Sequence, residues 1–97
     1  SGEKVSVTSI AANAFKGMKK LEKVTIGTNV SKIGKNAFSG DSKLKSIQIK
    51  SKKLTSVGKG ALKNISAKAV IKVPKSKKKA YTSLLKGKGQ KKSVKIK

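Results

Sequence analysis

Few residues of this chain have the type and spacing that catalysis requires. The clearest candidates are two Ser-x-x-Lys pairs, Ser42–Lys45 and Ser56–Lys59, in which a lysine of lowered pKa would activate a serine nucleophile. With 26 lysines among 97 residues such spacings arise by chance, and nothing nearby indicates a desolvated lysine. We therefore interpret both pairs as structural or solvent-exposed, and we expect the chain not to be an enzyme.

Other chemistry has even less support. The chain contains no histidine and no cysteine, so the usual zinc ligands are missing. Its three carboxylates, Glu3, Glu22 and Asp41, are far apart in sequence, which argues against a paired acid–base site and against a calcium cage. Gly58 and Gly60 lack the spacing of a phosphate-binding loop. We expect no catalytic residues, no metal and no cofactor.

Lysine is the one charged residue present in quantity. The formal net charge is +23, and residues 50–97 hold seventeen lysines and no acidic side chain. A polyanion would be attracted to such a field. The candidate polyanion patch consists of Lys75, Lys77, Lys78, Lys79, Lys86, Lys88, Lys91 and Lys92.

Two interpretations of this patch remain open. Its ligands would be cell-wall polymers, anionic glycans or, at low salt, nucleic acid bound nonspecifically. Sequence-specific nucleic-acid recognition is disfavoured, because arginine is absent and the three aromatic residues are expected to pack. The simpler interpretation, which we favour, is a solubilising lysine coat, or lysines that reflect the proximity of the full-length protein to an anionic cell wall.

An internal repeat sets the positions of these side chains. Apolar residues of the first unit recur 23 residues later in the second unit. From the second unit to the third the offset becomes 24, and we place the extra residue in the polar loop "KSKK" before Leu54. A further offset of 23 leads to Val94 and Ile96. Six apolar pairs of the first two units share an offset of 23 residues: Val7 and Val30, Ile10 and Ile33, Phe15 and Phe38, Leu21 and Leu44, Val24 and Ile47, and Ile26 and Ile49.

Each unit contains a short alternating segment, "KVTI", "SIQI", "VIKV" or "VKI", which predicts stacked parallel strands. Alternation directs one set of side chains inward: Val24, Ile26, Ile47, Ile49, Ile71, Val73, Val94 and Ile96. The opposite set forms a candidate ligand-binding face of Lys23, Thr25, Ser46, Gln48, Val70, Lys72, Ser93 and Lys95. Thr25, Gln48, Lys72 and Lys95 would form one row across four strands. Ordinary solvated strand positions would explain this face equally well.

Two further elements complete the expected architecture. The strings "IAANAFKG" and "IGKNAFSG" predict a single helical turn or tight bend per unit, with Phe15 and Phe38 filling the interior and Gly40 turning the chain. Residues 76–86 predict an amphipathic helix with Ser76 as N-cap and a stripe of Ala80, Tyr81, Leu84 and Leu85. A final strand is expected over 93–97.

The repeated pattern resembles the Treponema-type, BspA-like leucine-rich repeat. The resemblance lies in Ile10–Phe15, Leu21–Ile26, Ile33–Gly40 and Leu44–Ile49, and the ending "IKVPKSKKKAYTSLLKGKG" resembles the closing segment of such proteins from gut Firmicutes. Met18 and Asp41 stand where these proteins often have cysteine or asparagine. The resemblance implies an α/β solenoid with single helical turns on its back and a C-terminal capping helix and strand.

The resemblance also implies a domain organisation and a function. Residues 1–97 would form one leucine-rich repeat domain, with repeats to about residue 73 and a cap over 74–97. No convincing strand lies 23 residues before Val24–Ile26, so we interpret the chain as a C-terminal fragment of a longer protein. The expected function is adhesion: a noncatalytic module of a bacterial secreted or cell-surface protein that binds a protein or glycan, without membrane insertion and as a monomer.

Overall fold

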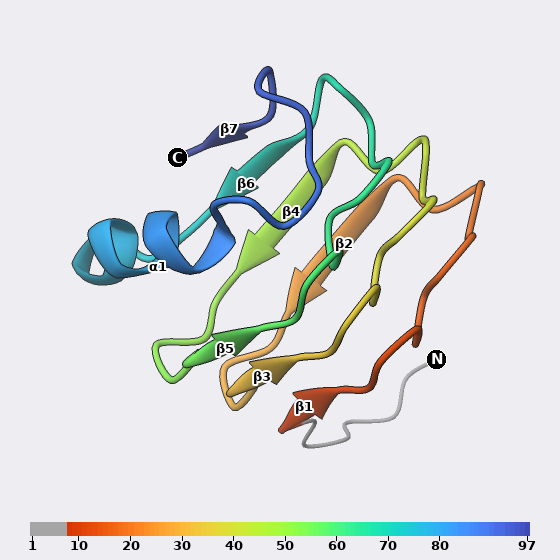
Figure 1. Cartoon of the computed structure of the whole chain (residues 1–97). Helices are drawn as coiled ribbons and strands as arrows, with labels where there is room; N and C mark the ends of the chain where they lie inside the picture. Colours follow the sequence, from red (N-terminus) through yellow and green to blue (C-terminus); the bar gives the residue numbers. More distant parts are fainter. Residues whose placement is uncertain (1–7) are drawn as a thin grey trace.

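The computed structural model describes residues 8–97, whose strands form two parallel sheets (Figure 1). The four-stranded sheet has the order β2 (Lys23–Ile26), β4 (Ser46–Ile49), β6 (Val70–Lys72) and β7 (Lys95–Ile96). The three-stranded sheet has the order β1 (Ser9–Ile10), β3 (Lys32–Ile33) and β5 (Ser56–Val57). As far as β6 the chain visits the two sheets alternately, so that each circuit stacks on the one before.

Strand register confirms the repeat over its first three units. Lys23 pairs with Ser46, an offset of 23, and Ser46 pairs with Val70, an offset of 24. The expected register of the last strand is wrong, because Val70 pairs with Lys95 at an offset of 25. The segment between β6 and β7 contains a helix in place of a second strand and turn, and this route uses two more residues.

The core lies between the two sheets and follows the predicted alternation. Ile26, Ile47, Ile49, Ile71 and Val73 are buried. Val24, Val94 and Ile96 are only partly buried and pack against that cluster. Strands closer to the middle of the stack have neighbours on both sides, which explains the deeper burial there. Glu3 and Val7 lie outside the described residues.

The two phenylalanines differ in environment, which corrects the prediction that both fill the interior. Phe38 is fully buried, whereas Phe15 is 36% exposed. Their rings stack, with centroids 5.5 Å apart and an interplanar angle of 3°. Phe15 belongs to the first described circuit, so only one face of its ring is covered by a neighbouring circuit. Phe38 belongs to the next circuit and is packed within the stack of circuits.

The repeated "NAF.G" segments are hydrogen-bonded turns, and the expected single helical turns are not formed at 12–17, 35–40 or 59–64. Alternate backbone N–H groups bond to the next circuit instead: Phe38 N donates to Ala61 O at 2.9 Å and Gly40 N to Lys63 O at 2.8 Å. A helix would use these donors internally. The tight bend, the other alternative offered by the sequence, is therefore the correct description.

Each turn has two residues with left-handed backbone, and these positions explain the letters of the repeat. Asn13, Asn36 and Gly60 occupy the first position with φ of 61°, 57° and 73°. Gly17, Gly40 and Asn64 occupy the second with φ of 73°, 81° and 60°. Glycine and asparagine adopt this conformation more readily than other residues. The third copy, "VGKGALKN", has glycine at the first position and asparagine at the second, and both residues keep the left-handed backbone conformation.

The C-terminal helix forms where the sequence predicts it, with different ends. A 3-10 turn, η1 (Lys75–Lys77), precedes α1 (Lys78–Leu85). Ser76 is not the N-cap, because it lies inside η1; Lys77 precedes α1 and no side chain caps it. Tyr81 and Leu85 are buried, but Ala80 is exposed and lies outside the apolar stripe.

Asp41 is a fully buried carboxylate in the turn after Gly40. Its Oδ1 accepts a hydrogen bond of 2.7 Å from the backbone N–H of Met18, and its Oδ2 has no partner among the described residues. Burial raises the pKa of Asp41, and the Met18 hydrogen bond opposes that rise only in part. Because the raised folded-state pKa favours the neutral acid, the contribution of Asp41 to stability is most favourable below its ordinary pKa and is lost as the pH rises through the folded-state pKa.

We expect Asp41→Asn to stabilise the fold at pH 7 by about 1 kcal/mol, because it removes a buried charge and keeps an oxygen for Met18 N–H. The advantage should shrink as the pH falls toward about 4, the ordinary aspartate pKa, and should vanish well below it, where Asp41 is neutral in both states. Urea unfolding at several pH values measures it. The control is Glu22→Gln, which makes the same change of charge at an exposed carboxylate and should alter the free energy of unfolding by less than about 0.5 kcal/mol. A pH-independent difference would contradict the explanation.

Candidate ligand-binding surface

The outward side chains of the four-stranded sheet form two rows. One contains Lys23, Ser46, Val70 and Lys95, and the other contains Thr25, Gln48 and Lys72. Ser46 and Val70 are half-buried and the remainder are exposed. Because paired residues of parallel strands project from the same face of the sheet, neighbouring side chains of a row are about 4.8 Å apart, the spacing of adjacent strands.

Two members of the predicted face have other positions. Lys95 pairs with Val70 and therefore lies in the first row, not beside Lys72. Ser93 lies in the turn before β7, where its hydroxyl donates a 2.6 Å hydrogen bond to Ala67 O. The offset of 25 residues, instead of 23, displaces both. Lys97 N donates to Ile71 O at 2.7 Å, so Lys97 follows Lys95 along the same edge.

The candidate polyanion patch divides into two groups. Lys75, Lys77, Lys78 and Lys79 belong to η1 and the first turn of α1. Lys86, Lys88, Lys91 and Lys92 belong to the segment between α1 and β7. The first group therefore lies at the start of the helix, and the second follows its end.

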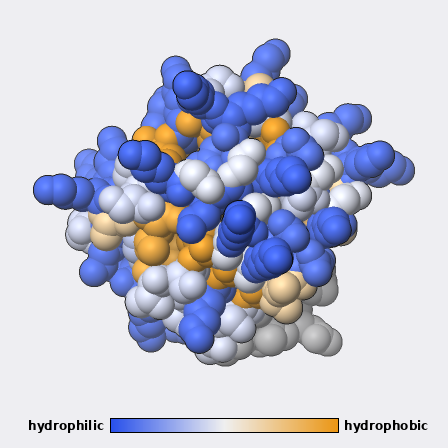
Figure 2. All heavy atoms as spheres, viewed as in Figure 1, coloured by the Kyte–Doolittle hydropathy of each residue, from blue (hydrophilic) through white to orange (hydrophobic). Residues whose placement is uncertain are grey.

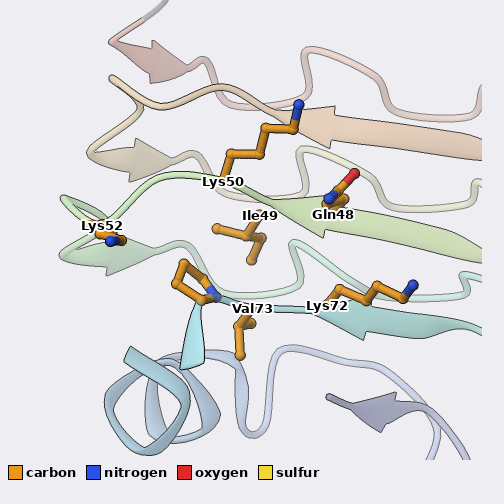
Figure 3. Close-up of a pocket in the computed structure, with 7 residues that line it drawn as sticks. Gln48, Ile49, Lys50, Lys52, Lys72 and Val73 are labelled. Carbon is orange, nitrogen blue, oxygen red and sulfur yellow. The ribbon is translucent and has the colours of Figure 1, made fainter. Parts of the chain in front are cut away.

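A pocket of about 270 Å³ lies at the carboxyl ends of β4 and β6. Its polar lining consists of Gln48, Lys50, Lys52 and Lys72, and its apolar lining of Ile49, Val73 and Pro74. In Figure 3, Ile49 and Val73 lie between the lysines, with Lys52 on one side, Lys72 on the other and Lys50 extending from the strand end. Gln48 and Lys72 were predicted site residues, whereas Lys50 and Lys52 were not.

The loop that carries Lys50 and Lys52 is held rigidly, which differs from the simple surface loop expected from "KSKK". Ser51 is fully buried, and its hydroxyl donates to Val30 O at 2.6 Å and accepts from Lys53 N at 3.0 Å. The Tyr81 hydroxyl of α1 donates to Ser51 O at 2.7 Å and accepts from Leu54 N at 3.1 Å. Buried bonds of this kind fix the backbone on both sides of Lys52.

Comparison with the preceding circuit shows which pocket residues are not repeated. Ile49 corresponds to Ile26 and Gln48 to Thr25 in the strand register. Continuing that register, Lys50 replaces Gly27, and Lys50 N donates to Ile26 O at 2.9 Å. The loop "KSKK" is one residue longer than the corresponding loop of the preceding circuit, and it contains two more lysines after Lys50. The sequence signal that could have indicated this site is the lysine at a position where the preceding circuit has glycine.

The surface has no catalytic arrangement among the residues described. Ser42, Lys45, Ser56 and Lys59 are exposed, which removes the desolvation that a Ser–Lys pair requires. Between residues 8 and 97, no cluster of three or more histidine, cysteine or acidic side chains could hold a metal, and no helix is long and apolar enough to cross a membrane. Figure 2 shows hydrophilic side chains projecting over much of one face, with apolar atoms visible between them.

Comparison with known proteins gives one match. The sequence profile of the BspA type leucine rich repeat region matches residues 4–97 in six copies. Neither the curated proteins nor the solved structures contain a match to the chain.

Proposed function

Because the chain belongs to the BspA-type leucine-rich repeat family, we propose that it is a noncatalytic binding module of a bacterial cell-surface or secreted protein. Its ligand is a protein or glycan. The observation that carries the proposal is the pair of outward rows on the four-stranded sheet, where Thr25, Gln48 and Lys72 are exposed in register. Extended faces of repeat proteins are suited to such binding.

We further infer that the stacked circuits form a solenoid and that the C-terminal segment closes its end. In support, Tyr81 and Leu85 of α1 are buried, and β7 pairs with β6 at the edge of the sheet. Atypical terminal units are expected in repeat proteins, because they shield the end of a continuous core. The binding module is expected to act as a monomer.

The test is binding to arrays of purified glycans and extracellular proteins, followed by titration of the strongest ligand. Thr25→Tyr, which adds bulk to the outward face, should weaken binding at least tenfold. Ser56→Tyr places the same side chain on an exposed position of β5 in the other sheet and should leave affinity within about threefold. Equal effects of the two substitutions, or no binding on any array, would contradict the proposed function.

A second candidate function, electrostatic binding of polyanions, is favoured by the start of the helix. Lys75, Lys77, Lys78 and Lys79 occupy η1 and the first turn of α1, without an acidic residue or a side-chain cap. Cations at this end oppose the helix dipole, and a bound anion would relieve that repulsion. Cell-wall polymers, anionic glycans and nucleic acid are the ligands of this alternative.

The two functions differ in salt dependence. Polyanion binding should weaken steeply between about 50 and 200 mM salt, whereas a shaped interface should lose much less affinity. Neutralising Lys75, Lys77, Lys78 and Lys79 with glutamine should weaken polyanion binding strongly and spare a ligand held by the outward face. Affinity that persists at high salt in that variant would exclude the electrostatic alternative.

A further inference from the structure

The pocket at the carboxyl ends of β4 and β6 is a shallow, open depression that is lined by lysines and by apolar residues. Lys50, Lys52 and Lys72 are exposed, while Ile49 and Val73 are buried beneath them and Pro74 is half-buried. An anion alone would need only the lysines. Pro74, the more accessible of the apolar lining residues, offers a small apolar surface to a ligand that has hydrocarbon area as well as charge.

The lysines of this pocket have no acidic side chain to neutralise them in their half of the chain. Residues 42–97 contain neither aspartate nor glutamate, and the nearest acid in sequence, Asp41, is fully buried. Their positive charges are therefore not compensated by an acidic side chain of that part of the sequence, and they attract an anion. The site therefore favours negatively charged ligands over neutral ones.

The pocket is also rigid, which lowers the entropic cost of binding. Lys50 N is bonded to Ile26 O, and Ser51 between the two loop lysines is fixed by Val30 and by Tyr81. Backbone held in this way positions the lysine stems before the ligand arrives. Ordinary solvated lysines on a flexible loop would not have this support.

We propose that this pocket binds an acidic sugar residue, a pyranose that carries a carboxylate or a sulfate. The ammonium group of one of the three lysines would bind the anion, the half-buried Pro74 would contact the C–H face of the ring, and the Gln48 amide would hydrogen-bond its hydroxyls. The volume of about 270 Å³ is just below the lower end of drug-sized sites, about 300 Å³, and suits a single saccharide unit of a longer glycan. This inference rests on the proposed glycan-binding function and names its ligand class.

Three probes define the ligand by calorimetric titration at about 150 mM salt, where long-range charge effects are screened. They are a κ-carrageenan tetrasaccharide, which carries two sulfates and no carboxylate, a hyaluronan tetrasaccharide, which carries two carboxylates and no sulfate, and sodium sulfate. At least one tetrasaccharide should bind at least tenfold more tightly than sodium sulfate, and the pair identifies sulfate or carboxylate as the preferred anion. Equal affinity for sodium sulfate and both saccharides would overturn the role of the sugar ring.

Matched variants locate the site. The triple substitution Lys50→Gln, Lys52→Gln and Lys72→Gln should weaken saccharide binding at least tenfold. The control triple Lys16→Gln, Lys19→Gln and Lys20→Gln removes the same charge from exposed positions before β2, at the opposite strand ends, and should change affinity less than threefold. Equal losses in both triples would reduce the binding to net charge and overturn the pocket.

A neutral substitution separates recognition from charge. Gln48→Ala should weaken the saccharide severalfold and leave sodium sulfate binding unchanged, because only the sugar hydroxyls use the amide. If array ligands bind and respond to Thr25→Tyr while neither Gln48→Ala nor the pocket triple has an effect, the acidic-sugar site is wrong and the proposed function stands. If no glycan or protein binds at all, the proposed function itself fails.

Discussion

Gly58→Ala is expected to destabilise the fold by more than about 3 kcal/mol, or to prevent folding altogether. A Cβ atom at Gly58 would lie 2.6 Å from the Gly34 carbonyl carbon and nearer still to the Lys35 nitrogen. All of these are backbone atoms of the preceding circuit, which cannot rotate away as a side chain can. The new methyl group would force the two circuits apart, and the 2.7 Å bond from Gly58 N to Ile33 O would be stretched or lost.

The matched control for this prediction is Gly27→Ala. No atom lies within 4 Å of a Cβ built there, and its backbone does not require glycine. Alanine at that position should be neutral or stabilise by up to about 1 kcal/mol, because it restricts the unfolded chain. Urea unfolding of both variants provides the comparison. A Gly58→Ala protein as stable as the wild type would show that the circuits can separate without cost.

The alternation of apolar residues was sufficient to predict the four-stranded sheet and most of its register. Ile47 and Ile49 are flanked by polar neighbours at a period of two, and burial between stacked circuits enforces that period. The three-stranded sheet was not identified from its residues, because two-residue strands such as Lys32–Ile33 have no alternation to detect. Those strands exist because neighbouring circuits bond to them.

The helix ends and the last strand depend on tertiary contacts that local sequence does not encode. Ser76 has the chemistry of an N-cap, yet the chain leaving β6 enters a 3-10 turn first and places Ser76 inside it. Beyond Pro74 a helical pattern replaces the apolar pairs that set the earlier offsets, so the residues themselves did not distinguish an offset of 25 from one of 23. Register there follows from the path length of the helix and turn.

The residues of the candidate site were predicted only in part, because some are positioned by local alternation and others by long-range contacts. Gln48 and Lys72 face outward by alternation alone, and both line the pocket. Lys50 and Lys52 belong to the site because Ser51 between them is buried, and that burial depends on a tyrosine thirty residues away in sequence. Long-range contacts of this kind cannot be recognised in the string "KSKK" itself.

Tyr81→Phe is expected to destabilise the fold by about 2–4 kcal/mol. The ring would stay in place, but Ser51 O would lose its donor and Leu54 N its acceptor, both in a buried environment. Each unsatisfied buried group costs about 1–3 kcal/mol. Thr82→Val, which removes an exposed hydroxyl bonded to Lys78 O in the same helix, should change stability by less than about 1 kcal/mol.

The same substitution should also affect the pocket without altering any residue that lines it. Loss of the tyrosine hydroxyl frees the backbone around Ser51, so the Leu54 amide should exchange faster with solvent and acidic-sugar binding should weaken severalfold. Hydrogen exchange and titration of Tyr81→Phe under conditions where it remains folded measure both effects. Unchanged exchange at Leu54 would mean that the loop is held by Ser51 and Val30 alone, and that α1 contributes only packing.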